Sequence, residues 1–345
     1  MEYKQLGDSE LLVSEICLGT MTYGQQNTVE EAREQLDYAV TQGINFIDTA
    51  EMYPVPTQAE TQGKTEEYIG EWLVKQQREQ LIIASKIAGP NPRISWIRGE
   101  NRRIDRANIE QAVEDSLKRL QTDYIDLYQI HWPDRYIPLF GAPAYDPSQE
   151  RDTVPILEQL EVFAELIKAG KIRYLGLSNE TPWGVCEFSH LAKQLELPRV
   201  VSIQNAFNLT NRVFHTHLAE ACRFHNLGLL AYSPLAFGCL TGKYINGIPE
   251  NSRLALFQGF GIRYEKTNLT EAVQEYVAIA DKHGISPAQM ALAFVRSRWF
   301  VASTIIGATS MEQLKENIGS LEVNLDEDIL AEIDAVHNRY PNPTP

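Results

Sequence analysis

Four side chains that could together deliver a proton to a carbonyl group follow short apolar runs of the sequence: Asp48, Tyr53, Lys86 and His131. A tyrosine can protonate a carbonyl oxygen, but its ordinary pKa of about 10 makes it a reluctant acid at neutral pH. The ammonium of Lys86 would lower the pKa of Tyr53, and Asp48 would keep that lysine charged and oriented. His131 could orient the carbonyl group through a ring nitrogen. These roles interlock and predict a catalytic site.

Each of the four side chains also has an ordinary structural explanation. An aspartate at the end of a strand can cap a helix, and a tyrosine can pack at the rim of a fold. A lysine there can be solvated, and a histidine can be a hydrogen-bonded core residue. We favour the catalytic interpretation because the four residues follow three consecutive predicted strands. A coincidence of all four is rarer than the presence of any one.

Eight short apolar runs alternate with helical stretches along the chain, after a hairpin-like piece at 3–13. The helical stretch 105–120 has Ile109, Val113 and Leu117 on one face, with Asp105 as its expected N-cap. This alternation predicts parallel βαβ units. The eight runs are residues 15–20, 44–50, 81–86, 124–132, 172–179, 200–205, 227–233 and 302–308.

Polar residues at the ends of the predicted strands decide between a closed barrel and an open doubly wound sheet. In a (β/α)8 barrel the carboxyl ends of all strands converge on one mouth, whereas in an open sheet they spread along an edge. We therefore expect residues 1–345 to form a single TIM-barrel domain, with the long loops 132–152 and 233–268 over the mouth. The polar residues are Asp48, Lys86, His131, Ser178, Asn179, Gln204 and Tyr232.

The composition excludes several classes of function. The 46 acidic and 31 basic residues give a net charge of −15, which argues against nonspecific binding to nucleic acid or to an anionic membrane. Four scattered cysteines without CxxC spacing and seven histidines without HExxH predict no metal site and no disulfide framework. The start of the chain has no signal-peptide pattern, and no apolar run is long enough to span a membrane. We expect a cytoplasmic protein.

Two nucleotide-binding motifs are absent from the sequence. The "GKT" at 63–65 lacks the first glycine of a phosphate loop, and no GxGxxG follows a predicted strand. Neither a P-loop nor a Rossmann dinucleotide site is therefore expected.

At "DTAEMY", "ASK" and "QIHW" the sequence resembles the aldo-keto reductase family, and the match extends over nearly the whole chain. The resemblance implies a (β/α)8 barrel that uses NADPH without a Rossmann domain and reduces an aldehyde or ketone to an alcohol. It places the family's catalytic Asp, Tyr, Lys and His on Asp48, Tyr53, Lys86 and His131. No metal is implied.

The resemblance also implies where the nicotinamide would lie. In "GKIRYLGLSN", Ser178 and Asn179 would hold the carboxamide, together with Gln204 of "IQN". Tyr232 in "AYSPLAFG" would stack on the nicotinamide ring and leave its other face open for hydride transfer. A core aromatic at a strand end is the alternative explanation for this tyrosine.

Cofactor phosphates would lie under the loop that follows Tyr232. The backbone amides of Ser233, Leu235 and Gly238, with the side chains of Lys243 and Arg253, resemble the family's phosphate contacts. This local positive charge would hold an anion on an acidic protein.

The segment "IIGATSMEQLKENI" resembles the family's adenosine-binding segment. Many members have an arginine where Gln313 stands, so selectivity for the 2′-phosphate would depend more on Lys243 and Arg253. We expect NADP(H) as the cofactor, although an exposed helix face would also explain the charged part of this segment. The residues carried over are Gly307, Thr309, Gln313, Glu316 and Asn317.

The order of motifs resembles the branch of the family that contains bacterial Tas-type proteins and potassium-channel β subunits. Pro54 stands after the tyrosine where a glycine is usual, and an insertion follows, which should alter the mouth. Trp132, Tyr136 and Phe140 are candidates for an apolar wall beside a small carbonyl substrate. No protein partner is indicated by the sequence itself.

Two other functions fit the same barrel. A cofactor-sensing regulatory module would bind NADPH tightly and turn over slowly, and fold does not separate it from an enzyme. An enzyme acting on a phosphorylated sugar is a weaker alternative, which the absence of nicotinamide binding would favour.

Overall fold

A closed barrel of eight parallel strands forms the centre of the protein, as the sequence predicts. The computed structural model describes residues 1–345 except 101, 143, 251 and 258–260. Strand β10 pairs with both β3 and β9, and this pairing closes the barrel. The strands are β3 (Ile16–Gly19), β4 (Phe46–Asp48), β5 (Ile82–Ile87), β6 (Ile125–Ile130), β7 (Ile172–Ser178), β8 (Val200–Ala206), β9 (Gly228–Tyr232) and β10 (Val301–Ile306).

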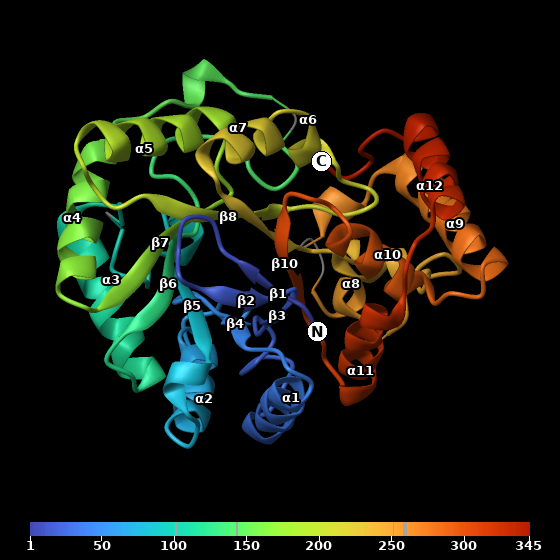
Figure 1. Ribbon diagram of the computed structural model, residues 1–345, viewed down its shortest axis with the longest axis horizontal. Coiled ribbons are helices and arrows are strands. Elements are labelled where there is room, and N and C mark those ends of the chain that lie inside the picture. Colours follow the sequence, from blue (N-terminus) through green and yellow to red (C-terminus); the bar gives the residue numbers. More distant parts are fainter. Residues whose placement is uncertain (101, 143, 251, 258–260) are drawn as a thin grey trace.

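Helices surround the barrel and alternate with its strands along the chain (Figure 1). Their ends follow the local sequence: Thr28 and Glu31 form a reciprocal capping box before α1, and the Asp105 side chain caps α3 as predicted. The described helices are α1 (Val29–Thr41), α2 (Lys64–Leu73), α3 (Arg106–Leu120), α4 (Ile156–Lys168), α5 (Pro182–Gln194), α6 (Val213–Thr216), α7 (Leu218–His225), α8 (Arg253–Leu256), α9 (Thr267–Lys282), α10 (Pro287–Arg296), α11 (Met311–Gly319) and α12 (Glu327–Arg339).

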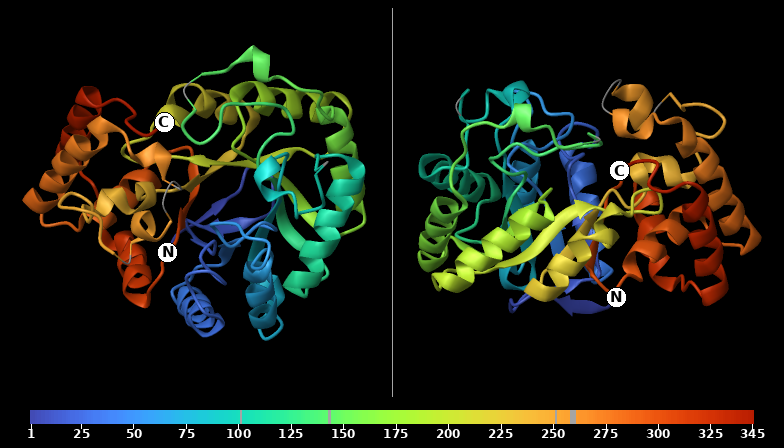
Figure 2. Two further views of the ribbon diagram at one scale, coloured as in Figure 1. Left: turned by 180° about the vertical axis from the view of Figure 1, so that it is seen from behind. Right: turned by 90° about the horizontal axis from the view of Figure 1, so that it is seen from above.

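An amino-terminal hairpin closes one end of the barrel. Strands β1 (Tyr3–Gln5) and β2 (Leu12–Ser14) pair antiparallel, and Leu6 and Leu11 from this hairpin are buried with the side chains that fill the barrel interior. The long connections that follow β5, β6 and β9 lie at the opposite end (Figure 2). The carboxyl ends of the strands therefore face these loops, at the end of the barrel away from the hairpin.

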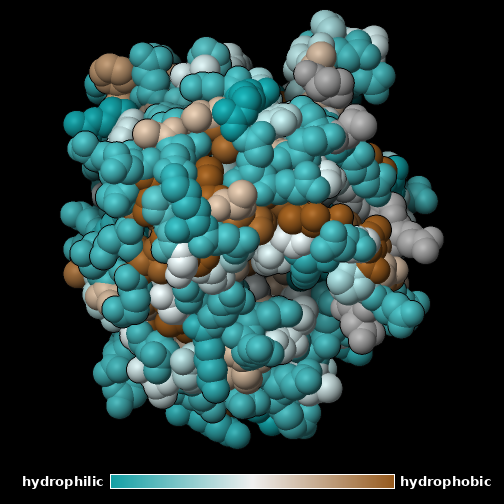
Figure 3. Space-filling view, turned by 90° about the vertical axis from the view of Figure 1, so that its right-hand side faces the viewer, coloured by the Kyte–Doolittle hydropathy of each residue, from teal (hydrophilic) through white to brown (hydrophobic). Residues whose placement is uncertain are grey.

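The outer surface is mainly polar, in keeping with the net charge of −15. On the face that carries α9, α11 and α12, apolar residues gather in bands near the middle and polar residues surround them (Figure 3). None of the helices described in the structure is long and apolar enough to cross a bilayer.

Close packing of α2 against α3 gives a test of this architecture. A Cβ atom added to Gly70 would lie 2.2 Å from the backbone oxygen of Arg119, so Gly70→Ala must push the two helices apart. We expect the free energy of unfolding to fall by about 2 kcal/mol, although alanine favours a helix. Urea denaturation measures this change.

The adjacent Glu71→Ala is the matched control, because Glu71 only forms an exposed ion pair with Arg33. Its free energy of unfolding should stay within about 1 kcal/mol of wild type. Equal stability of Gly70→Ala and wild type would contradict the packing described for α2 and α3.

Candidate active site

A buried ion pair joins the ends of β4 and β5. The Lys86 side chain is fully buried, and its Nζ atom lies 2.6 Å from Oδ2 of Asp48. The same ammonium donates to the backbone oxygen of Thr49 at 2.7 Å. Because Asp48 and Lys86 end neighbouring parallel strands, the barrel brings them together without any long loop. Asp48 therefore holds the lysine in one orientation inside the mouth.

Two amide side chains satisfy the other oxygen of Asp48. Nε2 of Gln204 donates to Oδ1 at 2.8 Å, and Nε2 of Gln129 donates to the same atom at 3.1 Å. The sequence analysis did not identify Gln129. The signal was present, because Gln129 lies two residues before His131 on the same strand run and therefore faces the same side.

Tyr53 lies in the turn after β4, with its ring beside the buried ammonium. The Lys86 Nζ atom is 4.9 Å from the centre of the Tyr53 ring. Burial raises the pKa of Tyr53, and the charge of Lys86 lowers it by less, so the pKa lies above its ordinary value. Lys86 lowers the pKa of Tyr53, as the sequence analysis expected. The expected net decrease is wrong, because burial has the larger effect. The phenol therefore stays protonated throughout the neutral range.

His131 completes the group. Its ring centre lies 5.8 Å from that of Tyr53 in an edge-to-face arrangement, and its Nδ1 atom is buried without a partner among the described residues. Burial, followed by the charge of Lys86, lowers the pKa of His131 well below its ordinary value. A neutral imidazole beside a protonated phenol can take part in hydrogen bonding to an oxygen atom without adding charge.

We call Asp48, Tyr53, Lys86 and His131 the tetrad. A hydrogen-bonded group of residues at the ends of β7, β8 and β9 lies next to it. The Tyr232 hydroxyl donates to Oδ1 of Asn179 at 2.7 Å, and Nδ2 of Asn179 donates to the backbone oxygen of His131 at 2.8 Å. The Ser178 hydroxyl donates to the backbone oxygen of Gln204 at 2.9 Å. The structure therefore brings together the four residues assigned to the nicotinamide and connects them to the tetrad through His131 and Gln204.

The loop after β9 has features of an anion site. Ser233 and Gly238 have positive φ values of 53° and 92°, and a Cβ atom at Gly238 would lie 2.8 Å from Cε of Lys243. Burial and then the charge of Arg253 lower the pKa of Lys243. Among the described residues, neither Lys243 nor Arg253 has an acidic group within 4.0 Å. Two neighbouring cations without an acidic partner fit a phosphate group. Leu235 precedes the short helical turn Ala236–Thr241 in this loop.

The expected adenosine segment follows β10 and includes the start of α11. Oε1 of Gln313 accepts from the backbone nitrogen of Thr309 at 3.0 Å, and Asn317 donates to the backbone oxygen of Gly307 at 3.2 Å. Glu316 accepts from the Ser286 hydroxyl at 2.6 Å. Gln313 therefore shapes the turn before α11 and brings no positive charge to it.

The three residues predicted to form an apolar wall beside the substrate lie in different surroundings. Trp132 is buried and its ring centre lies 4.9 Å from that of His131. Tyr136 pairs instead with Tyr145, at 5.4 Å between ring centres, and the side chain of Phe140 is exposed.

Sequence reasoning missed other groups near the mouth. Met52 and Leu139 pack in the cluster that contains Trp132. The guanidinium carbon of Arg263, from the turn Ile262–Tyr264, lies 6.0 Å from the Phe140 ring centre. No motif marks these residues, since their position depends on how the loops fold back.

A comparison with known families decides the assignment: residues 15–338 match the Aldo/keto reductase family. The chain belongs to this family. It is 53% identical to protein Tas of Escherichia coli strain K12, over the full length of both chains. It is 32% identical to the uncharacterized oxidoreductase YrpG of Bacillus subtilis, over 99% of this chain and 97% of YrpG.

A third relative has a different kind of name. The chain is 32% identical to a probable voltage-gated potassium channel subunit beta of Arabidopsis thaliana, over 94% of its own length and 92% of that protein. The predicted family and branch are thus confirmed. Family membership indicates an oxidoreductase that acts on carbonyl compounds, and the family generally binds NADP(H).

The buried ion pair predicts an unusual dependence of stability on pH. In wild type, burial lowers the pKa of Lys86, but Asp48 and then Tyr53 together raise it by more, so this pKa lies above its ordinary value. The pair's contribution is therefore complete below about pH 10 and is lost at higher pH. In Asp48→Asn the charge of the carboxylate is gone, so the folded-state pKa of Lys86 falls, and the free energy of unfolding of this variant should increase between about pH 7 and 9.5.

Urea denaturation at about pH 7 and about pH 9.5 measures how the free energy of unfolding changes with pH. Near neutrality, Asp48→Asn should lower this free energy by roughly 3 kcal/mol. Asp126→Asn is the control, since Asp126 is equally buried but pairs with two arginines, Arg78 and Arg173, instead of a lysine. A guanidinium stays charged in proteins. This variant should lower the free energy of unfolding by an amount that does not depend on pH. Parallel slopes for the two variants would contradict the prediction.

Proposed function

We propose that the protein catalyses the NADPH-dependent reduction of an aldehyde or ketone to an alcohol, with Tyr53 as the proton donor. The observation that carries this proposal is the ammonium of Lys86, held at 2.6 Å by Asp48 and 4.9 Å from the centre of the Tyr53 ring. Such an arrangement stabilises the phenolate that remains after Tyr53 has given up its proton.

The chain's own residues would act as follows. The carbonyl oxygen lies between the Tyr53 hydroxyl and a ring nitrogen of His131, which orient it by hydrogen bonds. A nicotinamide cofactor, when bound, would supply the hydride for the new C–H bond at the carbonyl carbon and would leave in its oxidised form. Tyr53 transfers its proton to the oxygen, the C=O bond becomes a C–OH bond, and Lys86 balances the phenolate charge. Trp132 keeps water from one side of this space.

Other residues would hold the cofactor. Ser178, Asn179 and Gln204 offer hydrogen-bonding groups for a carboxamide, and Tyr232 offers a flat ring beside it. Lys243 and Arg253 would bind phosphate groups, and the turn before α11 would hold the adenosine. The whole of residues 1–345 would serve as one catalytic domain.

A regulatory module that senses the cofactor is the second candidate. The likeness to a probable potassium-channel β subunit favours it, because the same barrel can serve binding as well as turnover. The two proposals differ in rate: an enzyme reduces small aldehydes rapidly, whereas a sensor binds NADPH and releases it slowly.

The first experiment measures NADPH oxidation by the purified protein with 4-nitrobenzaldehyde, beside Tyr53→Phe. We expect wild type to turn over and Tyr53→Phe to lose at least about 100-fold in kcat, because the proton donor is gone. Its Kd for NADPH should match that of wild type.

Each outcome separates the proposals. NADPH binding without turnover, on this and a wider panel of aldehydes, would favour the sensor. Full activity of Tyr53→Phe would exclude Tyr53 as the donor. Binding of neither NADPH nor NADH would remove the basis for both proposals.

Replacement of a phosphate-binding cation tests the cofactor assignment. We expect Lys243→Met to raise the Kd for NADPH about tenfold, equal to roughly 1.4 kcal/mol, because a charged hydrogen bond to phosphate is lost. NADH lacks the 2′-phosphate, so its Kd should rise less. Fluorescence titration with both cofactors gives the two values.

Lys282→Met is the control, because Lys282 is an exposed residue of α9 that pairs with Glu332. This variant should bind both cofactors as wild type does. An unchanged Kd for NADPH in Lys243→Met would remove Lys243 from the phosphate site.

A further inference from the structure

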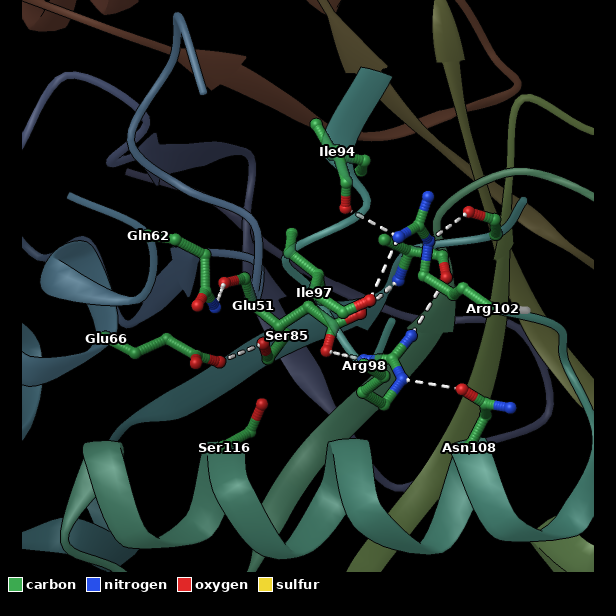
Figure 4. A network of polar contacts seen from close by, with 12 residues as sticks. Glu51, Gln62, Glu66, Ser85, Ile94, Ile97, Arg98, Arg102, Asn108 and Ser116 are labelled. Carbon is green, nitrogen blue, oxygen red and sulfur yellow. Dashed lines mark hydrogen bonds and ion pairs between the residues drawn. The ribbon is translucent and has the colours of Figure 1, made fainter. Parts of the chain in front are cut away.

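A second buried carboxylate, that of Glu51, lies between Asp48 and Tyr53 in the sequence. Glu51 is 2% exposed, and its Oε1 atom accepts from the backbone nitrogen of Ala88 at 2.5 Å. Its Oε2 atom forms an ion pair with Nη1 of Arg98 (Figure 4). No step of the proposed reaction uses this carboxylate, although it stands two residues from the proposed acid.

The contacts of Glu51 connect two parts of the tetrad. Its own backbone nitrogen donates to the backbone oxygen of Lys86 at 3.3 Å, and its side chain bonds to Ala88, two residues beyond that lysine. On the other side, the backbone nitrogen of Tyr53 donates to the oxygen of Ala50 at 3.0 Å. Glu51 thus fastens the turn that carries the phenol to the strand end that carries the ammonium.

Arg98 strengthens the same connection from outside the barrel. Besides the ion pair, its Nη2 atom donates to the backbone oxygen of Ala88 at 3.1 Å, and its Nε atom donates to Asn108 on α3 at 3.1 Å. Arg98 therefore binds both Glu51 and the residue that Glu51 binds. Figure 4 shows this guanidinium between the end of β5 and α3.

Packing alone does not call for a charge at this position. A buried ion pair is often no more stabilising than apolar residues of the same size, so its presence calls for a reason other than stability. The reaction supplies one, because proton transfer and charge stabilisation depend on distances fixed to within about 1 Å.

We propose that Glu51 is a positioning residue: its bonds to Ala88 and Arg98 fix the Tyr53 turn against the end of β5, and so fix the phenol relative to Lys86. This inference rests on the proposed role of Tyr53. Glu51 does not touch the reacting atoms, and it acts through the geometry of the pair.

Glu66 provides a matched control. It is also fully buried and paired, with the Ser85 hydroxyl at 2.5 Å and Nε of Arg119 at 2.7 Å. It lies on α2 and accepts from Ser85, the residue before Lys86, but its side-chain hydrogen bonds do not connect the Tyr53 turn to β5. Loss of either carboxylate leaves a buried arginine without its partner, so both changes should lower stability similarly.

The experiment compares Glu51→Ala, Glu51→Gln and Glu66→Ala with wild type and Tyr53→Phe, by kcat and KM for 4-nitrobenzaldehyde. For Glu51→Ala we expect kcat to fall between about tenfold and 100-fold, with the Kd for NADPH unchanged and KM changed less than about threefold. Glu51→Gln keeps an acceptor for the Ala88 nitrogen and should recover part of kcat. Glu66→Ala should stay within about twofold of wild type.

A solvent isotope effect separates positioning from a loss of structure. A misplaced acid slows proton transfer, so the ratio of kcat in H2O to kcat in D2O should rise for Glu51→Ala and not for Glu66→Ala. Equal losses of kcat in the two variants with unchanged isotope effects would overturn the proposal, and so would wild-type kcat in Glu51→Ala.

Two arrangements keep the test decisive. If Glu51→Ala does not fold, Arg98→Met and Arg119→Met replace the alanine pair, with the same expectation that only the first changes kcat and the isotope effect. Wild type and Tyr53→Phe report on the proposed function in the same assay. An active wild type and an inactive Tyr53→Phe, together with a fully active Glu51→Ala, would reject Glu51 alone.

Discussion

The ion pair between Lys86 and Asp48 is the interaction on which the rest of the site depends. A fully buried ammonium is costly, and the structure compensates it with a carboxylate at 2.6 Å and a backbone oxygen at 2.7 Å. The carboxylate in turn needs donors for its second oxygen, and two glutamines provide them. Each group therefore requires the next, and the polar interior at the mouth forms one connected network.

Burial and charge shift the pKa in opposite directions for Tyr53 and for Lys86, but in the same direction for His131. The same dry surroundings that raise the pKa of Tyr53 keep His131 neutral, and the Lys86 charge lowers the pKa of both. A site that holds a protonated phenol, a neutral imidazole and a charged ammonium at one pH has an acid and a neutral hydrogen-bonding group ready together. Family membership and this combination point to the same carbonyl chemistry.

Much of this arrangement could be predicted from the sequence, because it depends on local features. Each of the eight strands extends at most one residue beyond its predicted apolar run. Strand ends in a barrel must converge, so Asp48, Lys86 and His131 had to meet. The net pKa of Tyr53 could not be predicted, since burial depends on the finished fold. The pair of Glu51 and Arg98 spans 47 residues, and only the loop geometry brings it together.

The hairpin of β1 and β2 has a consequence for the order of events. Leu6 and Leu11 pack into the barrel interior at the hairpin end, so the tetrad of the described structure faces the loops at the other end. Under the proposed function, the cofactor and the carbonyl compound would both approach the tetrad from this loop end. We expect the cofactor to enter before the carbonyl compound and the alcohol to leave before the oxidised cofactor. A shared approach from one end of the barrel would thus set the order of binding and release, without a contribution from the tetrad residues.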